Sequence, residues 1–176
     1  MPSTREQIPA VDPTATPSAL ERAMRATVKT PAGTWLARVF AAKVDPWLLR
    51  HSNGRIDSGV GFPTLNLTTT GRKSGEPRTT TLLYFTRGED VVIIASSFGR
   101  DRHPAWLLNL RNDPRAELLC RGFRGAFTAR EADGQERQGL FDLADQMYGG
   151  YSRYQAKTDR EIPVMVLTPS PDAPPA

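Results

Sequence analysis

Residues that form disulfides or bind metals are scarce in this sequence. Its 176 residues include one cysteine, Cys120, and two histidines, His51 and His103. A single cysteine excludes an internal disulfide framework, and so few ligands argue against a structural zinc site. We therefore predict no metal centre. The lack of disulfides is typical of a reducing compartment, so we expect a cytoplasmic protein.

Long hydrophobic runs are also missing. No stretch approaches the 18 uninterrupted apolar residues that indicate a membrane-spanning helix. The first six residues contain no apolar segment of the kind found in signal peptides. The composition, with 39% hydrophobic and 24% charged residues, is that of a globular protein, and the length suits one domain.

Positive charge gathers in the middle of the chain. Residues 71–124 carry ten Lys and Arg against six Asp and Glu, within a whole-chain net charge of +4. Such a region suits an anionic partner: a phosphate, a carboxylate, nucleic acid or anionic lipid. Most of the cations are arginines. This preference has two equally good explanations: arginine binds phosphate well, or the base composition of the genome favours arginine codons. We expect no nucleic acid, because no recognised nucleic-acid-binding motif is present.

The proline-rich ends of the chain are predicted to be disordered, over residues 1–30 and 169–176, which leaves one domain over 31–168. Apolar spacing predicts an amphipathic helix over 31–44, and Asp45-Pro46 begins a short second helix. This apolar face either packs on the core or anchors the protein to the inner face of the cell membrane. The oligomeric state stays open, with a homodimer among the alternatives.

The middle of the chain is rich in predicted strands. Periodicity and turn residues predict helices over 104–110 and 133–147, and strands over 64–70, 78–86, 91–97, 116–120, 123–130 and 161–167. The strand at 91–97 is apolar enough to be buried on both faces. Six strands with few helices favour a mainly β fold with flanking helices (α+β), a closed or half-closed barrel and not a Rossmann sheet.

The turn at 71–78, GRKSGEPR, carries the strongest local signal. Its two glycines let backbone N–H groups approach an anion, and three cations and a serine add charge-assisted donors. The spacing is neither that of a Walker A loop nor G-x-G-x-x-G. An exposed β-turn without a ligand is the alternative.

Two further segments carry candidate functional residues. Residues 96–106, SSFGRDRHPAW, join a strand end to a helix N-terminus, where anionic or polar ligand atoms bind readily. His103 is there either a proton donor or a capping residue. Three of the four tyrosines form the second segment, Tyr148, Tyr151 and Tyr154. Their phenols either stack on a flat ligand and donate hydrogen bonds to it, or pack on the barrel.

Three blocks together resemble the deazaflavin (coenzyme F420)-dependent nitroreductase family. They are LTTTGRKSGEPR, HPAWLLNLRNDP and MYGGYSRYQAKTDREIPVMVL, and their order and separation match the family over about residues 45–168. The resemblance implies a split β-barrel, related to flavin-reductase and FMN-binding barrels, and coenzyme F420 as cofactor. FMN is a less suitable cofactor, because it lacks the oligoglutamate tail that the cationic turn would suit.

The resemblance also implies roles for particular residues. The anionic part of the cofactor would lie on the turn, and the ring system at the strand end and helix start. One departure is Phe98, where some members have a lysine; Arg100 and Arg102 are the candidates to replace its charge. The implied cofactor-binding residues are Arg72, Lys73, Ser74, Arg78, Ser96, Ser97, Arg100, Arg102, Ala105, Trp106 and Asn109.

The function implied is that of an F420H2-dependent quinone reductase or nitroreductase. A hydride would pass from the reduced deazaflavin to a quinone, an activated alkene or a nitroaromatic. Tyr148, Tyr151 and Tyr154 are the implied catalytic residues, bordering the acceptor and supplying a proton. Cys120 is predicted to be inert packing. The alternative is a split-barrel module that stores or carries deazaflavin, FMN or lipid without turnover.

Overall fold

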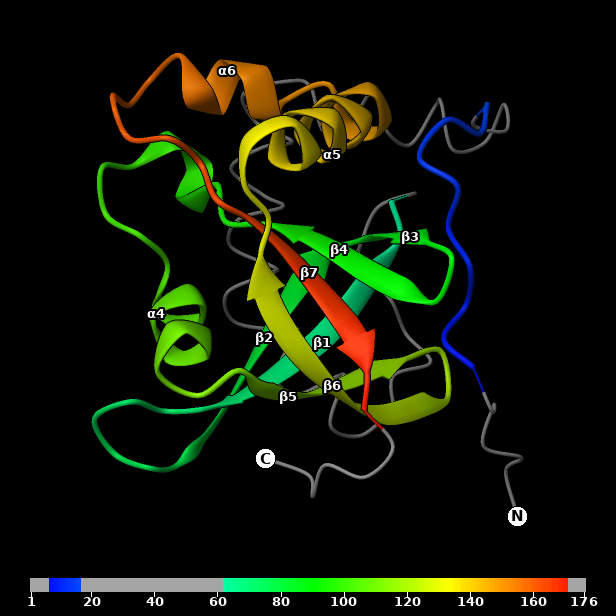
Figure 1. Cartoon of the computed structure of the whole chain (residues 1–176), viewed down its shortest axis with the longest axis vertical. Coiled ribbons are helices and arrows are strands. Elements are labelled where there is room, and N and C mark those ends of the chain that lie inside the picture. The colour runs from blue at the N-terminus through cyan, green and yellow to red at the C-terminus, as the bar shows by residue number, and fades with distance from the viewer. Residues whose placement is uncertain (1–6, 17–61, 171–176) are drawn as a thin grey trace, which may run out of the picture.

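One seven-stranded antiparallel sheet, ordered β2-β1-β5-β6-β7-β4-β3, forms the centre of the computed structural model, which describes residues 7–16 and 62–170. Figure 1 shows the sheet curling on itself, with β4 and β7 in front of β1 and β2. β2 and β4 also contact each other across the barrel. The mainly β, barrel-like fold predicted from the sequence is therefore confirmed. The strands are β1 (Thr64–Thr70), β2 (Pro77–Leu83), β3 (Phe85–Arg87), β4 (Asp90–Ile94), β5 (Arg115–Cys120), β6 (Phe123–Glu131) and β7 (Val164–Pro169).

Apolar side chains fill two layers on opposite faces of the sheet. Val91 and Ile93 of β4 point into the barrel interior, where α4 also contributes to the core. Val92 and Ile94 point the other way, into a second cluster with α5. Alternate residues of a strand face opposite sides, so β4 is buried on both faces, as its continuous apolar run predicts.

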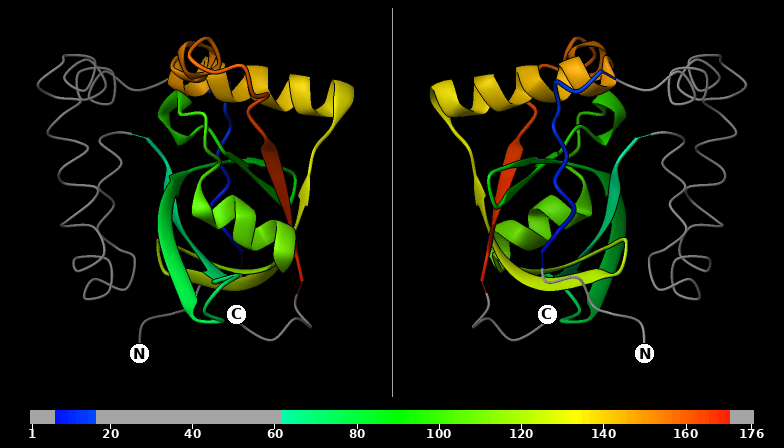
Figure 2. Two further views of the ribbon diagram at one scale, coloured as in Figure 1. Left: turned by 90° about the vertical axis from the view of Figure 1, so that its left-hand side faces the viewer. Right: turned by 90° about the vertical axis from the view of Figure 1, so that its right-hand side faces the viewer.

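Within residues 62–170, three α-helices and a short 3-10 turn flank the barrel: η1 (Ser97–Gly99), α4 (Ala105–Asn112), α5 (Gly134–Tyr148) and α6 (Tyr151–Gln155). Figures 1 and 2 show α5 and α6 above the sheet, and the left view of Figure 2 shows α4 in front of the barrel, on the side that lies at the left in Figure 1. Gly149, in the left-handed conformation at φ 69°, ends α5, and the chain turns directly into α6.

The strand predicted over 78–86 is two strands in the structure. β2 pairs with β1 as far as Leu83, and β3 pairs with β4 from Phe85 onwards. Tyr84 separates them: its N–H donates to the Pro63 carbonyl at 3.3 Å and its hydroxyl donates to the Pro9 carbonyl at 3.1 Å. The chain thus passes between the two ends of the sheet at one residue. β4 ends at Ile94, three residues before its predicted end, because the backbone then enters η1.

Part of the predicted N-terminal tail lies against the barrel. Val11 exchanges hydrogen bonds with Thr86 of β3: its N–H donates to Oγ1 at 2.8 Å, and its carbonyl accepts from the Thr86 N–H at 3.0 Å. Ile8 and Val11 also pack on the core. Residues 7–16 therefore differ from the disorder expected over 1–30, since they satisfy the exposed edge of β3.

The helices predicted over 31–44 and from Asp45 lie outside the described residues. Within 7–16 and 62–170, no helix is long and apolar enough to cross a membrane.

Candidate active site

The turn between β1 and β2 presents the predicted cations to solvent. Arg72, Lys73 and Arg78 are all exposed there. The Gly71 N–H donates to the Glu76 carbonyl at 2.8 Å and closes the turn. A Cβ on Gly71 would lie 2.8 Å from Ser74 Oγ and 3.0 Å from the Glu76 carbonyl oxygen, so the closed turn leaves little room for a side chain at this position.

Ser74 serves the turn itself. Its hydroxyl oxygen accepts from the Glu76 N–H at 3.3 Å and from Arg78 Nη2 at 3.4 Å. Ser74 thus directs the Arg78 guanidinium toward the same turn that carries Arg72 and Lys73. The arrangement is a cluster of exposed donors that would suit a multiply charged anion.

Asn109 of α4 connects this turn to the helix. Its side chain is buried, with 6% exposure. Oδ1 accepts from the Arg72 N–H at 3.1 Å, and Nδ2 donates to Thr69 Oγ1 at 3.0 Å. Both ends of the amide therefore contact protein, and Asn109 positions the turn. Its predicted contact with the cofactor would have to share these hydrogen bonds.

The predicted ring-binding residues at the start of α4 differ in their surroundings. Trp106 is buried in the barrel core, with 6% exposure, whereas Ala105 is exposed at the first turn of the helix. Ser96 and Ser97 are half-buried at the end of β4, and Arg100 and Arg102 are exposed in the loop that follows. Figure 1 places α4, this loop and the β1–β2 turn on the same side of the barrel.

Three consecutive residues of the β4–α4 loop have left-handed backbone: Ser97 (φ 50°), Phe98 (φ 59°) and Gly99 (φ 76°). A non-glycine residue in this region costs about 1–3 kcal/mol, and such strain gathers at functional sites. Gly99 also touches α6, because a Cβ there would lie 2.7 Å from the Tyr154 carbonyl oxygen. Among the described residues Arg121 is the third non-glycine residue with positive φ, but it lies in the tight β5–β6 hairpin with Gly122, where that conformation is ordinary.

The three tyrosines lie together at the end of α5 and on α6. The Tyr148 and Tyr154 hydroxyls are 2.9 Å apart and hydrogen-bonded, and both residues are half-buried. Tyr154 also meets the ring of Phe98 edge-on, with centroids 5.9 Å apart, so the tyrosines adjoin the β4–α4 loop.

Tyr151 has a different environment from the other two. It is 5% exposed and packs in the second core cluster, 6.3 Å from the Phe141 ring centroid. Burial raises the pKa of its phenol well above the ordinary value, since the phenolate would lose its hydration. Tyr151 is thus the most enclosed of the three predicted catalytic residues.

Arg160, which the sequence reasoning missed, fastens the β4–α4 loop from the segment that follows α6. Its guanidinium donates to the carbonyl oxygens of Ser96 at 2.9 Å, Ala95 at 3.3 Å and Arg100 at 2.9 Å. Its Nη1 lies 3.3 Å from His103 Nδ1. These partners are 57 to 65 residues away in the sequence, so no local pattern could reveal them.

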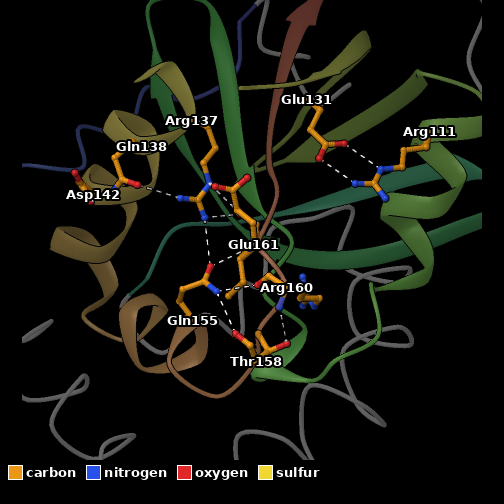
Figure 3. A network of polar contacts seen from close by, with 10 residues as sticks. Arg111, Glu131, Arg137, Gln138, Asp142, Gln155, Thr158, Arg160 and Glu161 are labelled. Carbon is orange, nitrogen blue, oxygen red and sulfur yellow. Dashed lines mark hydrogen bonds and ion pairs between the residues drawn. The ribbon is translucent and has the colours of Figure 1, made fainter. Parts of the chain in front are cut away.

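A neighbouring polar network holds the segment that carries Arg160 (Figure 3). Gln155 Nε2 donates to the Arg160 carbonyl at 2.8 Å, and its Oε1 accepts from the Ile162 N–H at 2.9 Å. Arg137 of α5 is 7% exposed and donates to the Ile162 carbonyl at 2.8 Å. Arg111 of α4 and Glu131 of β6 form a separate two-point ion pair, at 3.0 and 2.9 Å.

The sequence of this chain is similar to that of a known protein family. The sequence model for F420H(2)-dependent quinone reductase matches residues 42–169. F420H(2)-dependent quinone reductase Rv1261c of Mycobacterium tuberculosis is 34% identical over 142 residues, covering 76% of this chain and 95% of that protein.

The fold of this chain is also similar to that of solved structures. An F420-H2 dependent reductase is 36% identical with a TM-score of 0.56, covering 60% of this chain and 93% of that one. A second structure, described as a domain-swapped dimer, is 30% identical with a TM-score of 0.57, covering 78% and 99%.

Proposed function

The chain belongs to the F420H(2)-dependent quinone reductase family, and from this premise we propose that it catalyses hydride transfer from reduced coenzyme F420 to a quinone. Members of this family are enzymes that depend on the reduced cofactor. The observation that carries the proposal is the linkage of three separate sequence blocks: Asn109 joins α4 to the basic turn, and Phe98 joins the β4–α4 loop to Tyr154.

The exposed donors suit a cofactor with a phosphate and an oligoglutamate tail. Arg72, Lys73 and Arg78 would hold these negative charges, since each charge-assisted contact is worth about 1.5–3 kcal/mol. Ser96, Ser97 and Ala105 would line the ring system beside the strained loop. When bound, the reduced cofactor supplies the hydride, and the protein orients it and excludes water.

The tyrosines suit the acceptor. Their phenols are neutral near pH 7 and can donate hydrogen bonds to a carbonyl oxygen. The hydrogen-bonded pair of Tyr148 and Tyr154 would hold the quinone oxygen and deliver the proton that accompanies the hydride. Nitroaromatics and activated alkenes, which accept a hydride in the same way, are further candidate substrates.

We also infer a cytoplasmic protein that reaches quinones at the inner face of the membrane. The amphipathic face predicted over 31–44 would make that contact, and a homodimer is supported by the similar structure described as a domain-swapped dimer. Co-sedimentation with anionic vesicles and sedimentation velocity test these two points, and a monomer that leaves the vesicles free would contradict both.

The direct test of function combines the full-length protein with reduced F420, with and without menadione. We expect rapid reoxidation, measured by deazaflavin absorbance and fluorescence, only when both protein and quinone are present. Tight binding without turnover would instead indicate a storage module, and no binding would contradict the proposal.

Replacement of two cations tests the basic turn within the same assay. Arg72→Ala with Lys73→Ala should weaken F420 binding at least tenfold, which corresponds to about 1.4 kcal/mol. The matched control is Arg121→Asn with Arg124→Ala, which removes two exposed arginines from the β5–β6 hairpin. Asparagine tolerates the left-handed backbone of position 121. Equal loss in both variants would mean that net charge, and not the turn, controls affinity.

A further inference from the structure

Arg160 closes the β4–α4 loop from both ends. Two of the carbonyl groups it contacts, those of Ala95 and Ser96, precede the left-handed residues, and the third, that of Arg100, follows them. One guanidinium therefore spans the strained segment, as its rigid fork of donors allows. This contact opposes relaxation of Ser97 and Phe98 to ordinary backbone angles, together with the hydrogen bonds from the Gly99 and Arg100 amides to Ser96 and Ser97.

The same guanidinium also contacts the imidazole of His103. An arginine side chain only donates hydrogen bonds, so His103 Nδ1, 3.3 Å from Nη1, must be the acceptor. An imidazole whose Nδ1 accepts is neutral and carries its proton on Nε2. Charged groups from three elements act on this ring: Arg160, Arg111 of α4 and Glu131 of β6. Burial, followed by the two arginines, lowers the His103 pKa below its ordinary value, which agrees with a neutral ring.

The backbone of Arg160 is itself held by hydrogen bonds with two neighbouring side chains. The Gln155 side chain donates to its carbonyl, and the Arg160 N–H donates to Thr158 Oγ1 at 3.4 Å. Thr158 Oγ1 in turn donates at 3.0 Å to Oδ1 of Asp101, a residue of the β4–α4 loop. The segment after α6 and the loop before α4 are therefore fastened to each other at several points.

We propose that Arg160 is a positioning residue that presets the β4–α4 loop and fixes His103 in its neutral, Nε2-protonated form. The loop would then be ordered before a ligand arrives, which reduces the entropy lost on binding. This inference rests on the proposed function only where it concerns F420. The state of His103 and of the loop can be measured in the protein alone.

The first experiment reads the histidine by NMR of the imidazole nitrogens. His51→Gln leaves His103 as the single histidine, so its signals need no further assignment. We expect one tautomer, protonated on Nε2, and a pKa below the ordinary value. Arg160→Ala should mix the two tautomers and raise the pKa, because a nearby positive charge is lost. Arg124→Ala, an exposed control, should change neither.

Two comparisons separate positioning from charge. Arg111→Ala should raise the His103 pKa but leave the tautomer intact, since the contact with Nδ1 remains. Arg160→Lys keeps the charge, but one ammonium cannot serve three carbonyl groups and the imidazole. It should therefore speed hydrogen exchange at the amides of Gly99 and Arg100, which donate to Ser96 and Ser97, at least tenfold. The lysine variant also keeps the test decisive if the alanine variant fails to fold.

Binding of F420 completes the test. Arg160→Lys should weaken F420 affinity about tenfold and leave the KM for menadione within about twofold. An unchanged tautomer in Arg160→Ala, or unchanged loop exchange in Arg160→Lys, would overturn the inference. If the wild-type protein bound no F420, the proposed function would fail, while the NMR and exchange results would still decide the role of Arg160.

Discussion

Neighbouring tyrosines on α6 have different chemical environments. Tyr151 is enclosed in the second core cluster, whereas the half-buried Tyr154 shares a hydrogen bond with Tyr148. A phenol whose pKa is raised by burial is a weaker acid, so Tyr151 is poorly suited to donate a proton. The spacing in the sequence predicted that the three tyrosines lie close together. It could not distinguish a tyrosine packed in the core from one that borders the candidate active site.

Replacement of each phenol tests this division. Tyr154→Phe and Tyr148→Phe should each lower menadione turnover about 10²-fold, the lower end of the effect of a positioned proton donor. Tyr151→Phe is the matched control and should retain turnover within about threefold. F420 affinity should change little in all three variants, because the cationic turn is untouched. Tyr151→Phe giving the largest loss would reverse our assignment.

Other residues of the site could not be found from local pattern. Arg160 and Arg137 look in the sequence like ordinary surface cations, yet Arg137 is buried over the Phe141 ring and Arg160 fastens a distant loop. Arg137 also reaches the Ile162 carbonyl, 25 residues away, and Arg160 reaches the Ala95 carbonyl, 65 residues away. The GRKSG turn was predictable because its glycines, serine and cations are adjacent in the chain.

At the scale of elements, the β4–α4 loop and α6 depend on close approach. Gly99 has φ 76°, and a Cβ there would meet the Tyr154 carbonyl oxygen and the Lys157 side chain. Gly88, in the β3–β4 hairpin, has a similar φ of 63° but no atom within 4 Å of the same position. The two glycines therefore share a left-handed backbone conformation, which would strain any other residue, and differ in crowding.

Alanine at these two glycines separates the effects. Gly88→Ala should lower the free energy of unfolding by about 1 kcal/mol, the cost of left-handed backbone alone. Gly99→Ala should lower it by about 2–4 kcal/mol, because displacement of α6 adds to that strain. Urea unfolding of both variants measures the difference. Equal losses would show that α6 yields freely and that the contact with Gly99 matters little.

Element boundaries were predictable where a strand has a clear apolar or β-branched run. β1 spans Thr64–Thr70, as predicted, and α5 begins one residue after its predicted start. The break at Tyr84 was not predictable, because its partners Pro63 and Pro9 belong to other parts of the fold. The strand propensity of the sequence continues through Tyr84. The strand is divided there only because its pairing partner changes from β1 to β4.

For the whole molecule, the helical layer must stay fixed to the barrel. Glu136 of α5 binds both halves of the sheet: its carboxylate accepts from Arg87 of β3 at 2.7 Å and from Arg130 of β6 at 2.7 and 2.8 Å. Hydrogen bonds from Arg130 and then Arg87 lower the pKa of Glu136 from 4.5 to about 2. The ion pairs are partly exposed, so salt should weaken them.

This cluster predicts how stability depends on acid. A carboxyl group whose pKa is lower in the folded state stabilises the protein above its unfolded pKa, and this contribution disappears as pH falls through the folded value. The contribution of Glu136 should therefore be complete above about pH 4.5 and lost by about pH 2. Glu136→Gln should flatten the dependence of unfolding free energy on pH within this window, and 0.5 M salt should reduce the difference from wild type.

Asp113→Asn is the matched comparison, since Arg115 lowers the pKa of Asp113 to about 2 without joining α5 to the sheet. Both variants should flatten the acid profile, but only Glu136→Gln should speed hydrogen exchange in α5, and the same exchange in both would show that Glu136 does not hold the helix to the barrel.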